Sequence, residues 1–503
     1  MFAQPSTYSR PHRSATETQP SAGTAPDAET LMAPAGGGTV TAAVQARSGL
    51  RERTPMKRVA LASFVGSTIE FYDFYVYGTA AALVFPKVFF PHLGSTMATI
   101  ASLATFAAAF LSRPFGAVAF GHFGDRLGRK RTLVATLLIM GLSTVAVGLV
   151  PGTAAIGLAA PLILLTLRLL QGFALGGEWA GSALLTAEYA PTARRGMWGM
   201  FTSLGGGTGL VLTSLMFLGV NNTIGEKSSA FISWGWRVPF LFSAVLVVIA
   251  LYVRASVKET PVFAAQKARS ATPKAPVAEL FRFQRRHLVL ASGFVIGIFA
   301  FRYMASTYLT SYATHHLGYS RDLVMFVGVL GGLAVIALTA VSAWLCDTLG
   351  RRRIMLIGYT LALPWFFAVI LLLDHGGPIL FAAAIVGTYA IMGFTNGPVA
   401  TFTPEIFPTR YRYTGAGLAF NIGGILGGAI PPTSAGALMA AFGGWSIGLM
   451  MAIIVLASLV CTFLLPETMG TTLKDTDTHT GRWGALRWAP KTRRYDMRAQ
   501  EVW

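Results

Sequence analysis

Long apolar runs recur along this chain, and they constrain its fold more than any other feature. Each run has about 20 residues or more, the length that an α-helix needs to cross the roughly 30 Å hydrocarbon core of a bilayer. We find twelve, over about residues 58–83, 97–120, 132–150, 160–186, 197–219, 237–254, 288–313, 323–345, 354–373, 378–401, 415–440 and 445–465. Only 12% of the 503 residues are charged, whereas a soluble domain has about 25%. The sequence therefore predicts an all-α membrane protein with twelve transmembrane helices.

The basic residues fall on alternate connections between these runs. Lys and Arg gather at 126–131, 194–195, 351–353 and 410–412 and along 255–287. The connections in between are nearly free of positive charge, and 151–159, 374–377 and 441–444 hold no Lys or Arg. Basic connections of membrane proteins stay on the cytoplasmic side. Both termini and the central loop are therefore predicted to be cytoplasmic. The same alternation accounts for the net charge of +19 without a nucleic-acid partner.

Two stretches of the first half of the chain recur in the second half. "GHFGDRLGRKRTL" at 121–133 corresponds to "AWLCDTLGRRRIML" at 343–356, and "EYAPTARRG" at 188–196 to "EIFPTRYRYTG" at 405–415. This repeat predicts two pseudo-symmetric six-helix halves, a transporter architecture with its substrate site at midplane between them. The predicted parts are a disordered tail (1–55), the first half (56–254), a central loop (255–287), the second half (288–466) and a basic tail (467–503).

Four motifs together resemble the metabolite:H⁺ symporter family of the major facilitator superfamily over about residues 56–470: "GHFGDRLGRKR", "RLLQGFALGGEWAGSALLTAEYAPTARRG", "SWGWRVPFLFS" and "LPET". The resemblance implies the major facilitator fold, without a cofactor or a metal, and a monomer. It also implies proton-coupled uptake (symport) of a small organic solute across the bacterial inner membrane by alternating access. Members carry carboxylates such as α-ketoglutarate, citrate and shikimate, or zwitterions such as proline and betaine. The "GGEWAGSALL" stretch is closer to the shikimate type than to the α-ketoglutarate type.

Two acidic residues lie within the first apolar run. Glu70 and Asp73 are three residues apart and share a helical face. By residue depth, Arg113 of the second span is level with Glu70, and Arg168 of the fourth lies within roughly 6 Å of the depth of Asp73 at 1.5 Å per residue. Because intramembrane charges usually pair inside the bundle, we expect the pairs Glu70–Arg113 and Asp73–Arg168.

One of these carboxylates is predicted to carry the proton. Burial disfavours the charged form of a carboxylate and a nearby guanidinium favours it, so release of the arginine would let a proton bind. Asp73 is preferred, because Arg168 lies towards the outer entrance. Glu178, further inward on span four, is assigned either a relay to the cytoplasm or a packing or gating role. Permanent ion pairs that lock the helices together are the alternative reading.

Arg302 lies near the middle of span seven, between Tyr303 and Tyr308. The predicted spans of the second half offer no midplane carboxylate, so a substrate carboxylate is a candidate partner, with a pair to span one as the alternative. Members of the resembled family usually have an uncharged residue here, so Arg302 departs from that pattern. The other residues assigned to substrate binding are Tyr77, Gln171, Asn396 and Asn421.

The repeated loops are predicted to form a cytoplasmic gate. Its first ring consists of Asp125 and Arg129 with their counterparts Asp347 and Arg351. A second ring is predicted to pair Glu188 with Arg195 and Glu405 with Arg412.

Several alternatives to carboxylate symport stay open on sequence grounds. They are uptake of a zwitterionic osmolyte, efflux by antiport, and a membrane sensor that transports nothing. Antiporters tend to carry a Gly-Pro kink in span five, and the stretch "SLGGGTGLVLTSL" has no proline. An enzyme and a metal site are not expected, because no histidine pair has a metal-binding spacing such as H-E-x-x-H.

Overall fold

The computed structural model describes residues 55–127, 129–225, 228–255, 276–409, 412–471 and 473. All regular elements among these residues are helices. The predicted disordered tail lies outside the described residues, as does the predicted basic tail beyond residue 473.

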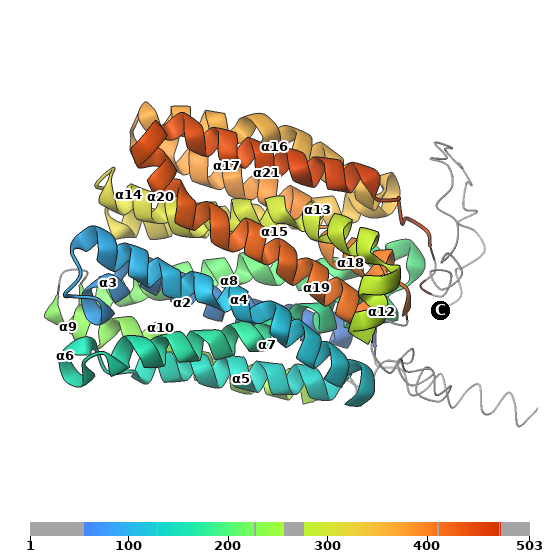
Figure 1. Cartoon of the computed structure of the whole chain (residues 1–503), viewed down its shortest axis with the longest axis horizontal. Helices are drawn as coiled ribbons and strands as arrows, with labels where there is room; N and C mark the ends of the chain where they lie inside the picture. The colour runs from blue at the N-terminus through green and yellow to red at the C-terminus, as the bar shows by residue number, and fades with distance from the viewer. Residues whose placement is uncertain are drawn as a thin grey trace, which may run out of the picture. The chain divides into compact units, whose positions relative to one another are not determined.

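Six long helices form the first half (Figure 1): α2 (Met56–Leu83), α4 (Ser95–Leu127), α5 (Arg129–Leu149), α7 (Ala159–Tyr189), α8 (Arg195–Ile224) and α10 (Val238–Ala255). Short helices connect them at one end: α3 (Phe85–Phe89), α6 (Thr153–Ile156) and α9 (Ser229–Ser233).

The second half contains α13 (Arg285–Tyr303), α15 (Arg321–Leu349), α16 (Arg351–Asp374), α17 (Pro378–Asn396), α18 (Val399–Ile406), α19 (Arg412–Gly424), α20 (Ile430–Phe442) and α21 (Gly444–Leu464). A π-helical turn, η3 (Met304–Leu309), joins α13 to α14 (Thr310–His315) within one span, and η5 (Ile425–Ala429) joins α19 to α20 within another. The stretch predicted as a central loop contains a further helix, α12 (Pro276–Phe283).

Eleven helical segments among the described residues are long and apolar enough to cross a membrane. The remaining long helix, α2, has 28 residues and contains both Glu70 and Asp73. It is buried against α8, α10 and α7. Together these helices make up the predicted all-helical architecture of two six-helix halves.

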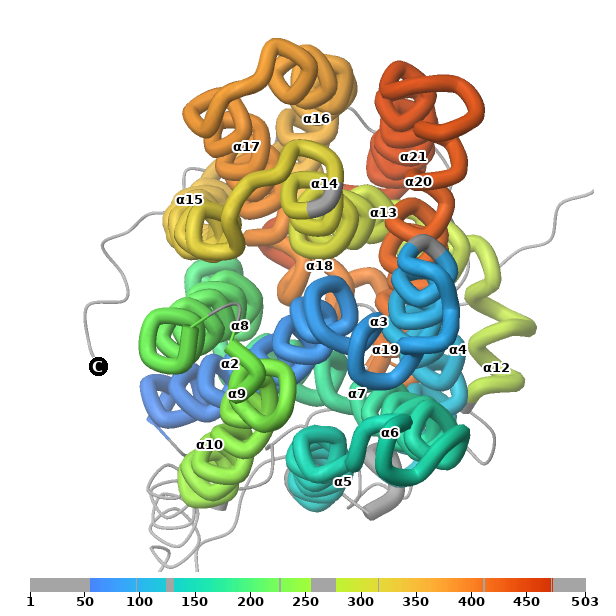
Figure 2. The backbone as a smooth tube through the Cα atoms, turned by 90° about the vertical axis from the view of Figure 1, so that its left-hand side faces the viewer, coloured from blue at the N-terminus to red at the C-terminus, as the bar shows by residue number. Residues whose placement is uncertain are grey.

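The two halves meet along a few helices. Viewed along the long helices, the first half (blue to green) and the second half (yellow to red) lie side by side (Figure 2), with α8 against α15 and α4 and α7 against α19. A Cβ atom on Gly207 of α8 would lie 3.0 Å from the carbonyl oxygen of Gly332 on α15. Glycine is needed there because it lets two helix backbones approach closely. Gly207 of span five therefore serves packing between the halves.

The basic loops gather at one end of the bundle. We call this the basic end: it is where α5, α8, α16 and α19 begin and where α12 lies (Figure 1). The helices α6, α9 and α14 lie at the opposite end.

Candidate functional site

Helix α2 carries two carboxylates through the core of the first half. Glu70 and Asp73 are 4% and 1% exposed. Oδ1 of Asp73 accepts a hydrogen bond from the Ser243 hydroxyl of α10 at 2.5 Å. Oε2 of Glu70 and Oδ2 of Asp73 have no hydrogen-bond partner among the described residues. Because a buried charge is costly unless it is paired, these two carboxylates are only partly compensated.

The predicted ion pair between Asp73 and Arg168 is not formed. Among the described residues Arg168 makes no salt bridge. Its Nη1 donates to Oε1 of Gln171 at 3.0 Å, and its guanidinium lies over the rings of Phe74 and Tyr77 at 4.3 and 4.0 Å. The expectation was wrong because depth along a helix does not determine rotation about its axis: the aromatic residues of α2 occupy the face that meets Arg168.

The predicted pair between Glu70 and Arg113 is wrong for the same reason. Arg113 makes no salt bridge within the described ranges. Its guanidinium lies 4.6 Å over the ring of Phe74 and 4.4 Å over that of Phe110. A desolvated cation–π contact stabilises a guanidinium by up to about 2 kcal/mol, but it does not replace a salt bridge to a carboxylate.

Arg302 reaches from the second half to α2. It is buried, its guanidinium lies 4.5 Å over the ring of Phe71, and Nη2 donates to Oδ1 of Asn396 at 3.4 Å. Asn396 in turn exchanges hydrogen bonds with Ser203 of α8 at 3.2 and 3.4 Å. Arg302 therefore meets span one through an aromatic face, and the described part of the chain offers it no carboxylate within salt-bridge distance.

The remaining residues assigned to substrate binding lie in different surroundings. Tyr303 packs edge to face on Phe106 and Phe110, and its hydroxyl has no hydrogen-bond partner in the described regions. Tyr77 donates to Thr105 at 2.8 Å. Tyr308 stacks on Tyr312, and Asn421 donates to the carbonyl of Gly176 across the halves.

Glu178 has a partner that the sequence did not reveal. Its Oε1 lies 2.6 Å from Nη2 of Arg254, and Nη1 of Arg254 donates to the carbonyl of Leu133 at 2.5 Å. Arg254 is the last residue of predicted span six, and it was assigned no role from the sequence. Gly66 of α2 leaves room for this guanidinium, because a Cβ atom there would lie 2.3 Å from Nη2 of Arg254.

Replacing Gly66 with Ala is expected to displace the Arg254 guanidinium and break its pair with Glu178. Loss of one partner of a buried pair costs about 3–5 kcal/mol, so we expect a large fall in the thermal unfolding temperature of the purified protein. Gly219→Ala is the matched control, because a Cβ atom at that helical glycine meets nothing within 4 Å. Equal unfolding temperatures for the two variants would contradict the role given to Gly66.

Several of the residues predicted to form a gate meet at the basic end, with different pairings. Oε1 of Glu405 lies 2.6 Å from Nη1 of Arg195 across the halves, and its Oε2 lies 3.4 Å from Nε of Arg351. Arg195 was predicted to pair with Glu188, at the end of α7, but its salt-bridge partner is Glu405. Arg412, predicted to pair with Glu405, donates to the carbonyl of Phe407.

Asp347 joins the halves in a second way. Its carboxylate accepts the backbone N–H groups of Gly196 and Met197 at 2.8 and 2.9 Å, at the start of α8. A carboxylate is stabilised at a helix N-terminus by the helix dipole. Asp347 also pairs with Arg351 at 3.1 Å. The side chains of Asp125 and Arg129, predicted to mirror this pair, lie outside the described residues.

Residues 467–471, assigned to the tail from sequence, contact these ion pairs. The Thr468 hydroxyl donates to Oε2 of Glu405 at 2.5 Å, and the carbonyl of Thr471 accepts from Arg195 at 3.2 Å. Glu467 accepts the backbone N–H groups of Arg351 and Arg352 at the start of α16. The segment therefore contacts both halves.

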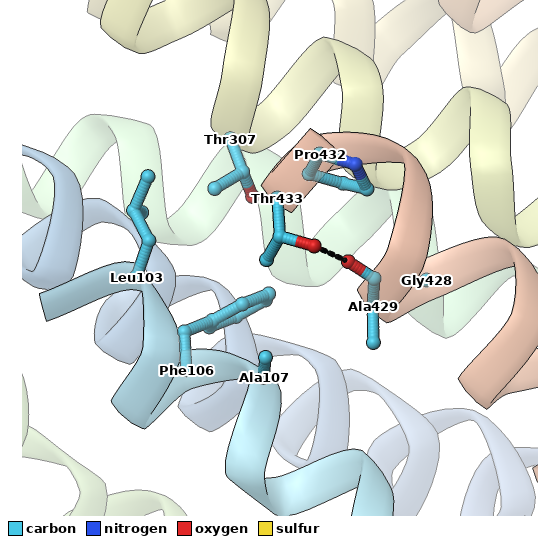
Figure 3. Close-up of a pocket in the computed structure, with 8 residues that line it drawn as sticks. All are labelled: Leu103, Phe106, Ala107, Thr307, Gly428, Ala429, Pro432 and Thr433. Carbon is cyan, nitrogen blue, oxygen red and sulfur yellow. Dashed lines mark hydrogen bonds between the residues drawn. The ribbon is translucent and has the colours of Figure 1, made fainter. Parts of the chain in front are cut away.

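The rings of Phe74, Phe106, Phe110 and Tyr303 pack together as an aromatic cluster. A pocket borders this cluster (Figure 3). It is small, with a cavity volume of about 10 Å³, which is room for about one water molecule. Its lining comes from both halves: Leu103, Phe106 and Ala107 of α4, Thr307 of η3, Gly428 and Ala429 of η5, and Pro432 and Thr433 of α20. The guanidinium of Arg168 lies 5.0 Å from the centroid of the Phe106 ring. This ring therefore lies beside both the pocket and that charge.

The two six-helix halves meet around buried charges that lack salt bridges, and ion pairs join the halves at one end. This arrangement defines a membrane transporter of the major facilitator fold. The chain belongs to the Major Facilitator Superfamily, whose sequence profile matches residues 63–432. The predicted resemblance is thereby confirmed at the level of the superfamily.

Relatives within this superfamily are named as metabolite transporters. The inner membrane metabolite transport protein YhjE of Escherichia coli is 42% identical over 83% of this chain and 96% of its own length. The shikimate transporter of E. coli is 40% identical over 77% of this chain and 89% of its own. The proline/betaine transporter of Salmonella typhimurium is 34% identical over 76% of this chain and 77% of its own. Like these relatives, the chain is a multi-pass transporter and not an enzyme.

Solved structures confirm the fold. The proton:xylose symporter XylE of E. coli superposes with a TM-score of 0.67 over 84% of this chain and 98% of its own, at 20% sequence identity.

Proposed function

We propose that this protein takes up a small carboxylate metabolite together with protons, by alternating access across the bacterial inner membrane. The basic end and both termini would then lie in the cytoplasm, as the charge alternation predicts. One observation carries the proposal: Arg113, Arg168 and Arg302 bring three buried guanidinium groups to the region where the halves meet, and none has a salt bridge in the described structure. An anionic substrate would supply the missing charge.

Competition for this positive charge would couple the proton to the substrate. Glu70 and Asp73 draw their compensation from the surrounding guanidinium groups, and a substrate carboxylate bound to the same groups would take part of it away. Loss of that compensation favours neutralisation of the α2 carboxylates by a proton. Asp73 is the proposed carrier, because its Oδ2 is unpartnered and its Oδ1 is held by Ser243. Glu178 and Arg254 form the proposed relay through which the proton leaves towards the basic end.

Uptake into proteoliposomes containing the purified protein tests this proposal. With shikimate or a dicarboxylate outside, an imposed pH gradient, acidic outside, should drive accumulation above the external concentration. An equal pH on both sides should allow only equilibration. Accumulation under the opposite gradient would identify an antiporter, and no movement of any carboxylate would reject carboxylate transport.

Uptake of a zwitterionic osmolyte is the second candidate, supported by the proline/betaine transporters among the relatives. Aromatic faces can bind a quaternary ammonium group. In this chain, however, the rings of Phe71, Phe74 and Tyr77 are already covered by guanidinium groups. This arrangement favours an anion over a cationic headgroup.

Arg302→Ala is expected to weaken exchange and net uptake alike, because it removes a binding contact used in every transport cycle. A hydrogen bond to a charged group is worth about 1.5–3 kcal/mol, so affinity for a carboxylate should fall roughly 10- to 100-fold. Concentration dependence of uptake measures this fall, and Arg302→Lys, which keeps the charge, is the control. An equal loss for betaine and for the carboxylate would make Arg302 a structural residue.

A further inference from the structure

Helix α12 differs from the other helices in its orientation. In both views it lies across the ends of the long helices, at the periphery of the basic end and beside α19 (Figures 1 and 2). It contacts α13 and α19. One residue, Gln284, separates α12 from the membrane-spanning α13, which begins at Arg285. Because the two helices are joined so closely, α12 lies at the level of the lipid headgroups.

The side chains of α12 divide between protein and solvent. Leu280 is fully buried and Gln284 nearly so, and these two anchor the helix to the bundle. Phe281 and Phe283, by contrast, are 51% and 63% exposed. Two phenylalanines exposed beside the start of a transmembrane helix have the position of an aromatic belt at the membrane surface.

Basic residues accompany these rings. Arg282, Arg285 and Arg286 are exposed, and the guanidinium of Arg282 lies 5.4 Å over the ring of Phe283. The carboxylate-bearing residue of α12, Glu279, is half-buried. The exposed side chains at this junction of α12 and α13 therefore combine two apolar rings with three positive charges. An amphipathic helix with this composition lies in the membrane interface and is attracted to anionic lipids.

We propose that the α12 surface, defined as Phe281, Arg282, Phe283, Arg285 and Arg286, binds the headgroups of anionic phospholipids in the leaflet at the basic end. The rings insert between the headgroups and the upper acyl chains, and the arginines contact the lipid phosphates. The interaction would anchor the connection between the two halves to the membrane, whatever substrate is carried. It does not depend on the proposed carboxylate transport.

The test compares lipid-dependent stability of the full-length protein in detergent. Phosphatidylglycerol added to phosphatidylcholine should raise the unfolding temperature of the wild-type protein, because a ligand that binds only the folded state stabilises it. Each basic residue near an anionic surface contributes roughly fivefold in affinity, so Arg282→Gln, Arg285→Gln and Arg286→Gln together should weaken phosphatidylglycerol binding about a hundredfold. Phe281→Ser with Phe283→Ser should weaken it without a change in net charge.

Lys57→Gln, Arg58→Gln and Arg353→Gln together are the matched control, since they remove three exposed charges at the same end. This variant should keep the response to phosphatidylglycerol. The proposal is overturned if the control loses the response equally, which would indicate general charge attraction, or if the wild-type protein shows no response. Equal stabilisation by inorganic phosphate alone would also overturn it, because the site would then bind a free anion and not a lipid.

Discussion

Asp73→Asn is expected to abolish accumulation driven by a pH gradient while exchange of labelled for unlabelled substrate continues. The amide resembles the protonated acid and cannot release a proton, so net coupled transport stops. Exchange involves no net proton movement and should proceed at a rate close to that of the wild-type protein. Counterflow and gradient-driven uptake, measured in the same proteoliposomes, separate the two activities.

Two further variants identify which group carries the proton. Ser243→Ala removes the hydrogen bond to Asp73 at 2.5 Å but keeps the carboxylate, so it should shift the pH dependence of uptake without abolishing coupling. Glu70→Gln tests the neighbouring carboxylate on the same helical face. If Asp73→Asn still accumulates substrate and Glu70→Gln does not, the carrier is Glu70.

Glu405→Gln is expected to open the basic end of the transporter. The carboxylate of Glu405 meets Arg195 on one half, Arg351 on the other, and Thr468 of the C-terminal segment. Its loss leaves two buried guanidinium groups without this counter-ion, at about 3–5 kcal/mol for breaking a buried pair. The closed state should therefore lose population by a factor of 100 or more, at roughly tenfold per 1.4 kcal/mol.

Labelling of a cysteine behind the gate measures this opening. Thr401 is buried on α18, and its hydroxyl donates to the carbonyl of Arg195. In a background of Cys346→Ala and Cys461→Ala, the Thr401→Cys variant should react with a membrane-impermeant maleimide much faster when combined with Glu405→Gln. Asp374→Asn, which neutralises an exposed carboxylate at the opposite end, should leave the rate unchanged.

A double-mutant cycle checks that the effect comes from the pair between Arg195 and Glu405. Contacting residues show interaction energies of about 0.5–3 kcal/mol in such cycles. Additive effects of Arg195→Gln and Glu405→Gln on the labelling rate would show that this salt bridge does not hold the basic end closed.

The contacts at the basic end extend beyond the twelve spans, to residues 467–471. Glu467 and Asp347 each accept two backbone N–H groups at the start of a helix, α16 and α8 respectively. Opening the basic end must break the contacts of Asp347 with α8, because they join the two halves. The contacts of Glu467 with α16 can remain, since both belong to the second half and its C-terminal extension.

The architecture of the protein could be predicted from its sequence. Span length, alternating basic loops and the repeat around Asp125 and Asp347 are properties of order along the chain. They predict an all-helical membrane protein of two related halves, because a bilayer requires apolar helices of fixed length. The depth of each buried charge also follows from its place in a span, so the sequence could identify Glu70, Asp73, Arg113, Arg168 and Arg302 as intramembrane charges.

The contacts that each of these charges makes, by contrast, depend on how the helices pack. A contact depends on rotation about the helix axis and on which half supplies the neighbour, and neither follows from depth. Arg113 and Arg168 therefore lie against aromatic rings and not against carboxylates. Arg195 pairs with Glu405, 210 residues away, where the pattern along the chain indicated Glu188. Arg254 reaches Glu178 because Gly66 leaves room for its guanidinium, a condition that arises when α2 and α10 are packed together.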